Sequence, residues 1–377
     1  MNRTDLLHRM FMAVGLAAAL AFAPAGGTAE AKDKIKIGFI GPLSGGNAQQ
    51  GLGARNGFLL AIEQKAGDDY PYEVEPVVLD DASDPQTGVS AAMKLVNDPD
   101  VVAATGHWNS PVALATIPVF NRAGMPFIIW GAIGPSITDQ NLPEITRVTP
   151  TLAAENLPLA AWAVENLGKR IAIVSDTSDY GTSNAENFGG AVRDNGGEVI
   201  AEDLLPVGTT DFRSVLTRIK GMDPDAVYFG GVITEAGILR KQMIDLGVDV
   251  PMLGISGIYD VEFIAIAGDA AEGTMAGYPA AQTNPKLDQL TADYEARGFS
   301  EPTSPYTKYA YEAASIILEA IQEVGIDDKA ALAQAIRDIE YEGVLGTTTF
   351  DENGQTEVPV EIEIHEVKGG KWVPREE

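Results

Sequence analysis

Short runs rich in β-branched and apolar residues alternate with stretches of helical spacing through most of the chain. The runs span residues 35–40, 74–79, 101–105, 127–130, 171–175, 199–204, 226–229 and 252–254. Predicted helices between them include residues 53–64, 113–122, 184–195 and 236–246. Because strand and helix alternate, and the runs are apolar on both sides of the pleat, the pattern predicts parallel sheets covered by helices on both faces. The predicted fold class is therefore α/β with doubly wound parallel sheets.

The alternation forms two series, which predicts two lobes. It pauses after Leu142 and resumes near Ile171, and past Tyr278 long helices follow without strands between them. Those helices have no sheet of their own, so we expect them to return to the first lobe. The expected first lobe is residues 32–150 with 279–349, and the second is 151–278 with 350–377. We also expect a closing hairpin that pairs 347–350 with 360–367. The three connections would form a three-segment hinge beside a cleft where the strand ends meet.

Length and charge narrow the class of protein further. At about 150 residues per domain, a chain of 377 residues allows two domains, each with its own core. Acidic residues outnumber basic ones by 54 to 26, for a formal net charge of -28. A surface of that charge repels phosphate backbones and anionic headgroups. We therefore expect no nucleic-acid partner, and we expect a monomer.

The first residues have the order of a secretory signal. Arg3, His8 and Arg9 precede an apolar run over 10–23, and small residues follow up to Ala31. The run is shorter than the roughly 20 residues that a membrane-spanning helix needs. We expect cleavage near Ala31 and an exported protein. The chain has no cysteine, so neither a lipid anchor on cysteine nor a disulfide is available.

Motifs for catalysis are missing from the sequence. The glycine loop at 41–46 lacks the Lys and Ser/Thr ending of a phosphate-binding loop. Past the signal only His107 and His365 remain, and neither a zinc-binding HExxH motif nor a GxSxG nucleophile motif occurs. The acidic cluster at 80–84 is typical of a turn and helix cap. The sequence predicts no enzyme, no metal site and no cofactor.

Polar and aromatic residues gather where predicted strands end. Trp108, Asn109 and Ser110 follow the third strand, and Trp130, Ala132 and Ile133 lie in the segment after the fourth. In the second lobe, Tyr180 opens a helix, and Ser256 and Tyr259 follow the last strand. Because the carboxyl ends of parallel strands meet at one edge of a sheet, these residues are expected to converge on one ligand cleft.

With these residues in view, the sequence resembles the leucine/isoleucine/valine-binding family of periplasmic solute-binding proteins that serve ABC transporters. The resemblance rests on residues 36–45, Asp80, Asp81, Asp84, Pro85, Gly106, His107, Ser110, 170–175, Tyr180, Gly181, 228–231 and 271–273. It implies a type I periplasmic binding protein with a Venus-flytrap fold of two closing lobes. It also implies a periplasmic location, a small organic solute and a cognate ABC permease in the inner membrane.

The resemblance also implies site residues. Ser110 matches the family's ligand-binding serine, and Tyr180 matches its cleft tyrosine. Ser256 stands where amino-acid-binding members carry a glutamate that pairs with the ligand ammonium, and Ile133 stands where they carry a threonine. Two further tyrosine positions are occupied by Gln50 and Val232.

These departures bear on the identity of the solute. Without the acid, a buried ammonium would lie unpaired, at a cost of about 3 kcal/mol. The sequence therefore favours an organic carboxylate over an amino acid as the solute. Ser110 and helix-start amides would hold the carboxylate beside an aromatic wall. Asp260 or Glu235 could restore an ammonium partner. The alternative function is the sensing domain of a signalling receptor that binds an amide, a urea-like solute or a quaternary amine.

Overall fold

The computed structural model describes residues 32–280 and 284–375, and the predicted export signal lies outside this range. The chain divides into a unit from Met1 to Asp33 and a unit from Lys34 to Glu377, and all elements below belong to the second. Within the described ranges, no helix has both the length and the apolar character that a bilayer crossing requires.

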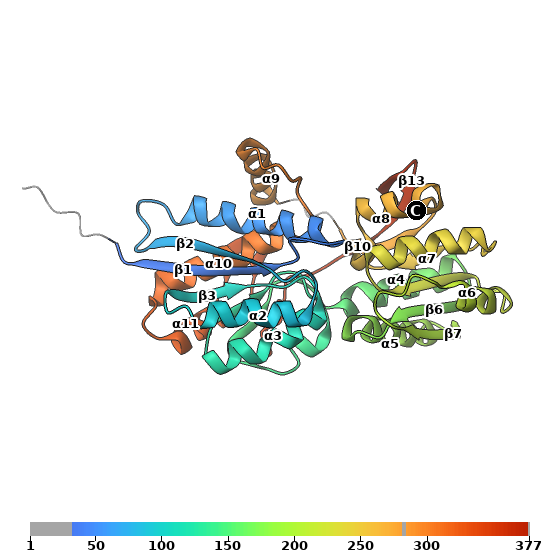
Figure 1. Cartoon of the computed structure of the whole chain (residues 1–377), viewed down its shortest axis with the longest axis horizontal. Coiled ribbons are helices and arrows are strands. Elements are labelled where there is room, and N and C mark those ends of the chain that lie inside the picture. The colour runs from blue at the N-terminus through green and yellow to red at the C-terminus, as the bar shows by residue number, and fades with distance from the viewer. Residues whose placement is uncertain (1–31, 281–283, 376–377) are drawn as a thin grey trace, which may run out of the picture. The chain divides into compact units, whose positions relative to one another are not determined.

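The first lobe is built on a five-stranded parallel sheet of order β2-β1-β3-β4-β5. The strands are β1 (Lys34–Gly41), β2 (Glu73–Asp80), β3 (Val101–Thr105), β4 (Phe127–Ile129) and β5 (Ile145–Arg147). The helices are α1 (Ala48–Lys65), α2 (Pro85–Val96), α3 (Ser110–Ala123) and α10 (Thr307–Val324). One face of the sheet is covered by α1 and α10, and α2 and α3 cover the other (Figure 1). The predicted doubly wound architecture is confirmed.

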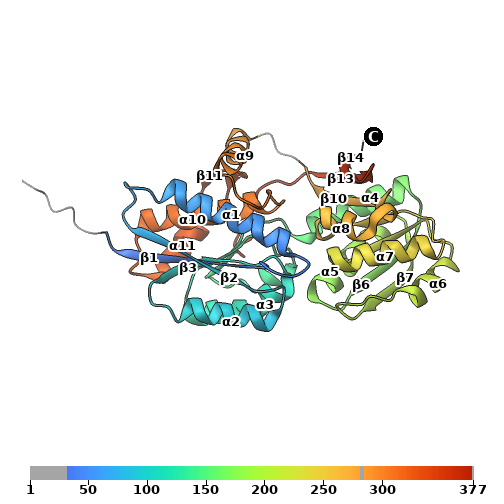
Figure 2. The ribbon, with the colours of Figure 1, turned by 45° about the horizontal axis from the view of Figure 1, so that its top comes forward.

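The second lobe is built on a seven-stranded sheet of order β14-β13-β10-β9-β8-β6-β7. Its parallel strands are β6 (Arg170–Asp176), β7 (Glu198–Leu205), β8 (Ala226–Gly230), β9 (Met252–Gly254) and β10 (Met275–Pro279). The antiparallel strands β13 (Ile362–Lys368) and β14 (Lys371–Pro374) extend it beyond β10. The helices α4 (Leu152–Asn166) and α5 (Asp179–Asp194) pack on one face. The helices α6 (Arg213–Lys220), α7 (Ile233–Asp245) and α8 (Val261–Ala267) lie on the other face (Figure 2).

The chain passes between the two sheets more than once. It enters the second sheet after Arg147 and leaves it after Pro279. The helices α9 (Pro285–Arg297), α10 and α11 (Lys329–Arg337) follow, and α10 packs against α1. The chain then returns to the second sheet at Ile362.

The chain turns back at Asp351–Gly354, with an isolated antiparallel bridge between Phe350 and Thr356, but the predicted pairing of 347–350 with 360–367 is wrong. Strand β12 (Gly346–Thr348) pairs with β11 (Tyr341–Gly343), and β13 pairs with β10 and β14. The turn between β13 and β14 is Gly369–Gly370, and both glycines have positive φ, of 58° and 73°. Two-residue hairpin turns favour such residues, so the tight hairpin forms there rather than across the longer Asp351–Gly354 loop.

Capping residues fix the segments that follow the strands. Asp84 begins α2, and its Oδ1 accepts a hydrogen bond of 2.8 Å from the N–H of Thr87. Ser178 begins α5 in the same way, with its Oγ 3.1 Å from the N–H of Gly181. Each cap satisfies helix-start N–H groups and so holds the preceding loop in place at the carboxyl edge of its sheet.

Candidate functional site

A cavity of about 580 Å³ is lined by residues from both lobes. Seven of the predicted site residues line it: Trp108, Asn109, Ser110, Ile133, Tyr180, Val232 and Ser256. They come from the segments after β3, β4, β8 and β9 and from the first turn of α5. The strand-end pattern therefore located the cleft, hereafter the interlobe cleft.

Aromatic rings form one wall of the interlobe cleft. Trp108 and Tyr306 line it with ring centroids 6.1 Å apart at an interplanar angle of 85°. Trp130 lies behind Tyr306 at 6.0 Å and is fully buried, with its ring stacked on Phe39 at 5.5 Å. The indole N–H of Trp130 donates to the carbonyl of Ile40 at 3.2 Å. Trp130 thus supports the wall from the core and does not line the cleft.

Three other predicted residues also lie outside the lining. Ala132 is fully buried, and its N–H donates to the carbonyl of His107 at 2.9 Å. Gln50 is buried and donates from Nε2 to the Asp260 carboxylate of the other lobe. The ring of Tyr259 stacks on Tyr278 with centroids 4.4 Å apart. Their side chains are engaged in packing or bridging, so the cleft does not reach them.

Several polar atoms of the lining have no hydrogen-bond partner among the described residues. They are Asn47 Oδ1, Asn109 Oδ1, Tyr180 Oη and Ser256 Oγ, all buried. Asn109 begins α3, yet its side chain forms no capping bond. Because a buried polar atom without a partner costs free energy, four such atoms around one cavity indicate a place where a polar solute supplies the partners.

The charged residues that line the cleft are acidic. Asp176 and Glu235 line it, and the lining includes no lysine, arginine or histidine. Burial raises the pKa of both carboxyl groups, and the hydrogen bonds from Ser178 to Asp176 partly oppose this. Asp260, the other proposed ammonium partner, does not line the cleft. Its Oδ1 caps α8 at 2.6 Å from the N–H of Glu262.

Some lining residues were not predicted from the sequence. Tyr306 precedes the first turn of α10, far along the chain from the strand ends, and only its place after Pro305 at a helix start signals it. Asp176 is the last residue of β6, so the strand-end rule applied to that strand would have found it.

The acidic cluster and His107 form hydrogen bonds that hold the loops after β1 and β3. His107 Nδ1 lies 2.7 Å from Asp81 Oδ2, and both side chains are fully buried. Asp80 accepts hydrogen bonds of 2.8 Å from the N–H groups of Leu43 and Ala82, which fixes the loop after β1. Over the described ranges, no group of three or more His, Cys, Asp or Glu side chains is arranged to hold a metal ion.

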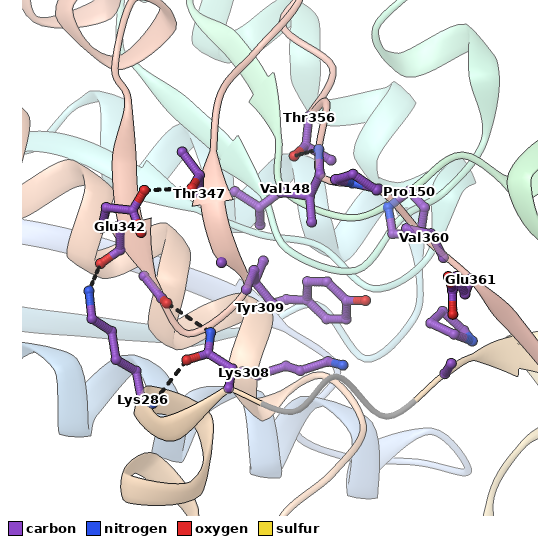
Figure 3. A pocket seen from close by; sticks show the side chains of 18 of the residues that line it. Val148, Pro150, Lys286, Lys308, Tyr309, Glu342, Thr347, Thr356, Val360 and Glu361 are labelled. Carbon is purple, nitrogen blue, oxygen red and sulfur yellow. Dashed lines mark hydrogen bonds between the residues drawn. The ribbon is translucent and has the colours of Figure 1, made fainter.

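A second cavity of about 590 Å³ is lined by all three segments that connect the lobes (Figure 3). Val148, Pro279 and Val360 line it, one from each connecting segment. Lys308 and Tyr309 extend side by side into it, with the ammonium 5.1 Å from the ring centroid. None of its lining residues carries a buried side-chain polar atom without a partner. This hinge cavity is as large as the interlobe cleft, but it lacks the unsatisfied polar atoms that indicate a solute site.

Comparison with known proteins agrees with this architecture. A family model described as periplasmic binding protein matches residues 34–371. The leucine-, isoleucine-, valine-, threonine- and alanine-binding protein of Pseudomonas aeruginosa is 33% identical over 358 residues, which cover 93% of each chain. The crystal structure of a leucine-binding protein from Thermotoga maritima superposes with a TM-score of 0.83 at 27% identity, over 91% of this chain and 98% of that one. A solute-binding protein from Rhodopseudomonas palustris in complex with 3,4-dihydroxybenzoic acid superposes at 0.78 and 26% identity, over 90% and 95%.

Proposed function

The chain belongs to the periplasmic binding protein family, and we propose that it is the extracytoplasmic solute-binding component of a branched-chain-amino-acid-type ABC transporter. The observation that carries the proposal is the interlobe cleft, where unpartnered buried oxygens from both lobes surround a space of about 580 Å³. A cavity of this volume is the size of a small-molecule site. It would bind a small polar organic solute without altering it.

Capture would proceed by movement of the two lobes about the connecting segments. Residues 32–150 with 279–349 would form one lobe, and 151–278 with 350–377 the other. Side-chain contacts between them include Gln50 with Asp260, Ser136 Oγ with Asp179 Oδ1 at 3.0 Å, and Arg147 Nε with Gln355 Oε1 at 2.6 Å. A solute that contacts both walls stabilises the closed form by its differential affinity. The cognate permease in the inner membrane would then receive the solute from the closed protein, which acts as a monomer.

Export to the periplasm follows from the same proposal. The signal at the start of the chain would be removed near Ala31, leaving the unit that begins at Lys34. The matched relatives are solute-binding proteins, so the proposed role involves no chemical step.

The related proteins bind two classes of solute. The Pseudomonas protein is named for branched-chain and small amino acids, and the Rhodopseudomonas protein was solved with an aromatic acid. We propose a solute of one of these two classes. Ser110 and the helix-start N–H groups of α3 would hold its carboxylate, and Trp108 and Tyr306 would contact its side chain.

A ligand screen tests the proposed function. Native mass spectrometry of the purified protein should reveal one co-purified solute per chain, and a thermal-shift panel of amino acids, organic acids, amides and amines should raise the melting temperature with its members of one class. The bound compound should be recovered unchanged. Turnover of a compound, or no stabilisation by any member of the panel, would contradict the proposal.

A further inference from the structure

A buried carboxyl group lies directly behind the wall of the interlobe cleft. Glu155, in the first turn of α4, is 1% exposed, and its Oε2 accepts a hydrogen bond of 2.9 Å from the N–H of Ser256. Glu155 lines a cavity of about 10 Å³ together with Ile133, Ser256 and Tyr306. Those three residues also line the cleft. One layer of residues therefore separates this carboxyl group from a bound solute.

Among the described residues, none with a positive charge acts on Glu155. No ion pair to it is formed by any described residue, and burial raises its pKa to about 7, although the hydrogen bond from Ser256 favours the ionised form. The groups that face it are tyrosines from α5, β8, β10 and the start of α10, namely Tyr180, Tyr228, Tyr278, Tyr306 and Tyr309. Burial is the main cause that raises the pKa of each, so all five are neutral at pH 7. A carboxylate in this setting gains most from the arrival of a cation.

The cleft side of Ser256 offers what a cation with hydrogen-bond donors requires. Ser256 Oγ and Tyr180 Oη line the cleft, and neither has a hydrogen-bond partner of regular geometry among the described residues. An ammonium group carries three donors and no acceptor, so these oxygens match it. A carboxylate at this end would face the charge of Glu155 and, in the lining, meet no basic side chain.

We propose that Glu155 determines the class of solute, by supplying the negative charge for an ammonium group that lies against Ser256 and Tyr180. This inference rests on the solute-binding function proposed above and narrows it to amine-bearing solutes. It replaces the expectation of an organic carboxylate, which followed from the absence of an acid at position 256. The missing charge is supplied from α4 instead.

The other acids fit this role less well. Asp176 lines the cleft, but its Oδ1 already accepts hydrogen bonds from the N–H and the hydroxyl of Ser178. Asp260 already binds Gln50 and caps α8, and it lies outside the cleft lining. Glu235 lines the cleft, but its Oε1 accepts a hydrogen bond of 3.1 Å from Gly208, next to Val207, which is 61% exposed. The Glu235 carboxyl is therefore already bonded to the loop at Gly208.

The first test compares matched solutes in the wild type and in Glu155→Gln. The pairs are leucine with 2-hydroxy-4-methylpentanoate and phenylalanine with 3-phenyllactate, and 3,4-dihydroxybenzoate is an acid without an amine. The wild type should bind the amine of each pair more tightly than the hydroxy acid. In Glu155→Gln, the affinity for the amine should fall about 30-fold or more, and the affinity for the hydroxy acid should not fall. In Glu235→Gln, the affinity for the amine should fall a few-fold at most. Glu312→Gln, a matched buried carboxyl that lines none of the cavities described above, should leave affinity unchanged.

The second test needs only the wild type, so it remains decisive if Glu155→Gln does not fold. An ammonium beside Glu155 lowers the pKa of its carboxyl, so binding at pH 7 should release protons, as titration calorimetry in buffers of different ionisation enthalpy would measure. An organic carboxylate should instead raise that pKa and take up protons. Where Glu155→Gln folds, it should release fewer protons than the wild type, because Asp176 and Glu235 contribute the remainder.

The outcomes separate this inference from the proposed function. Tight binding of 3,4-dihydroxybenzoate or of a hydroxy acid, with no preference for an amine, overturns the role of Glu155 and leaves the proposed function standing. Equal affinity of the wild type and Glu155→Gln for an amine does the same. Failure to bind any compound of the full thermal-shift panel speaks against the proposed function itself.

Discussion

Two glutamates of similar burial lie in regions that differ in how well their oxygens are bonded. Glu312, within α10, accepts hydrogen bonds of 2.8 Å from the N–H of Val344 and from the hydroxyl of Thr348, one at each oxygen. The hydrogen bonds described for Glu155 come from a single residue, Ser256, whose N–H lies 2.9 Å from Oε2. Burial raises the pKa of both carboxyl groups to about 7. The pKa alone therefore does not separate a structural carboxyl from one beside a solute cavity, whereas the hydrogen bonds do.

The chain encloses the two groups differently. The β11–β12 hairpin closes over Glu312 so tightly that a Cβ on Gly343 would lie 2.0 Å from Oε2. Lys65 also favours the charged form of Glu312. Glu155 has no such cation, and it borders a cavity that shares its lining with the interlobe cleft. The protein itself therefore supplies a cation near Glu312, whereas no described residue supplies one for Glu155.

The pH dependence of stability should contain a contribution of up to about 3 kcal/mol from each of the two groups. A carboxyl with a folded pKa of about 7, raised from 4.5, retains its proton longer in the folded state than in the unfolded state. Its contribution to the free energy of unfolding is therefore present below pH 4.5, falls as the pH rises towards 7 and stays lost above it. Glu155→Gln and Glu312→Gln should each flatten this fall in urea unfolding curves.

Repeating the unfolding experiment with the protein saturated by an amine-bearing solute should separate the contributions of the two glutamates. The solute should remove the contribution of Glu155 to the fall and leave that of Glu312 in place. If both contributions persist in the presence of solute, the two regions are equivalent and the comparison fails.

Truncation of each side chain should have unequal effects at pH 5, where both carboxyls are neutral. Glu312→Ala leaves the N–H of Val344 and the hydroxyl of Thr348 without an acceptor, and should lower the free energy of unfolding by about 2 kcal/mol. Glu155→Ala leaves one N–H unpaired and should cost about 1 kcal/mol. Chemical denaturation measures both. Equal losses would mean that the number of hydrogen bonds does not distinguish the regions.

Local sequence patterns predicted most of the fold. Eight strands were expected within two residues of their ends because each is a run rich in apolar or β-branched residues and bounded by turn residues. β5 and β10 were missed, since β5 has only three residues and β10 carries Gly277 and Pro279. The closing hairpin was misassigned because the pairing of β13 with β10 joins segments distant in sequence. No local pattern encodes that pairing.

The candidate site divides in the same way. Residues such as Trp108 and Ser110 follow strands, and parallel sheets bring strand ends together, so their place in the cleft was predictable. Tyr306 and Glu155 come from the starts of α10 and α4, and their positions depend on how the lobes and connecting segments pack. A glutamate in a first helical turn is usually an exposed group that favours the helix dipole, so nothing in the sequence indicated that Glu155 is buried.

A hydroxyl on the cleft side should contribute about tenfold in affinity. Ser110 is 2% exposed and lines the cleft, and its Oγ accepts a hydrogen bond of 3.0 Å from the N–H of Gly134, which leaves its own proton free for a solute carboxylate. Ser110→Ala should therefore weaken binding about tenfold. Ser315→Ala is the matched control on the helix of Glu312, since its buried hydroxyl donates to the carbonyl of Tyr311 at 2.8 Å. Calorimetry that finds both variants unchanged would remove Ser110 from the site.

The smallest expected effect concerns the tyrosine that lies between the cleft and Glu155. Tyr306 lines both the cleft and the small cavity beside Glu155, so its hydroxyl can contact a solute while its ring maintains the wall with Trp108. Tyr306→Phe keeps the ring and should weaken binding only about threefold. Tyr70→Phe removes an equally buried hydroxyl, which donates to the carbonyl of Leu318 at 2.8 Å, and should lower stability without changing affinity. A loss of affinity for Tyr70→Phe as large as for Tyr306→Phe would show that binding responds to core stability in general rather than to the atoms around Glu155.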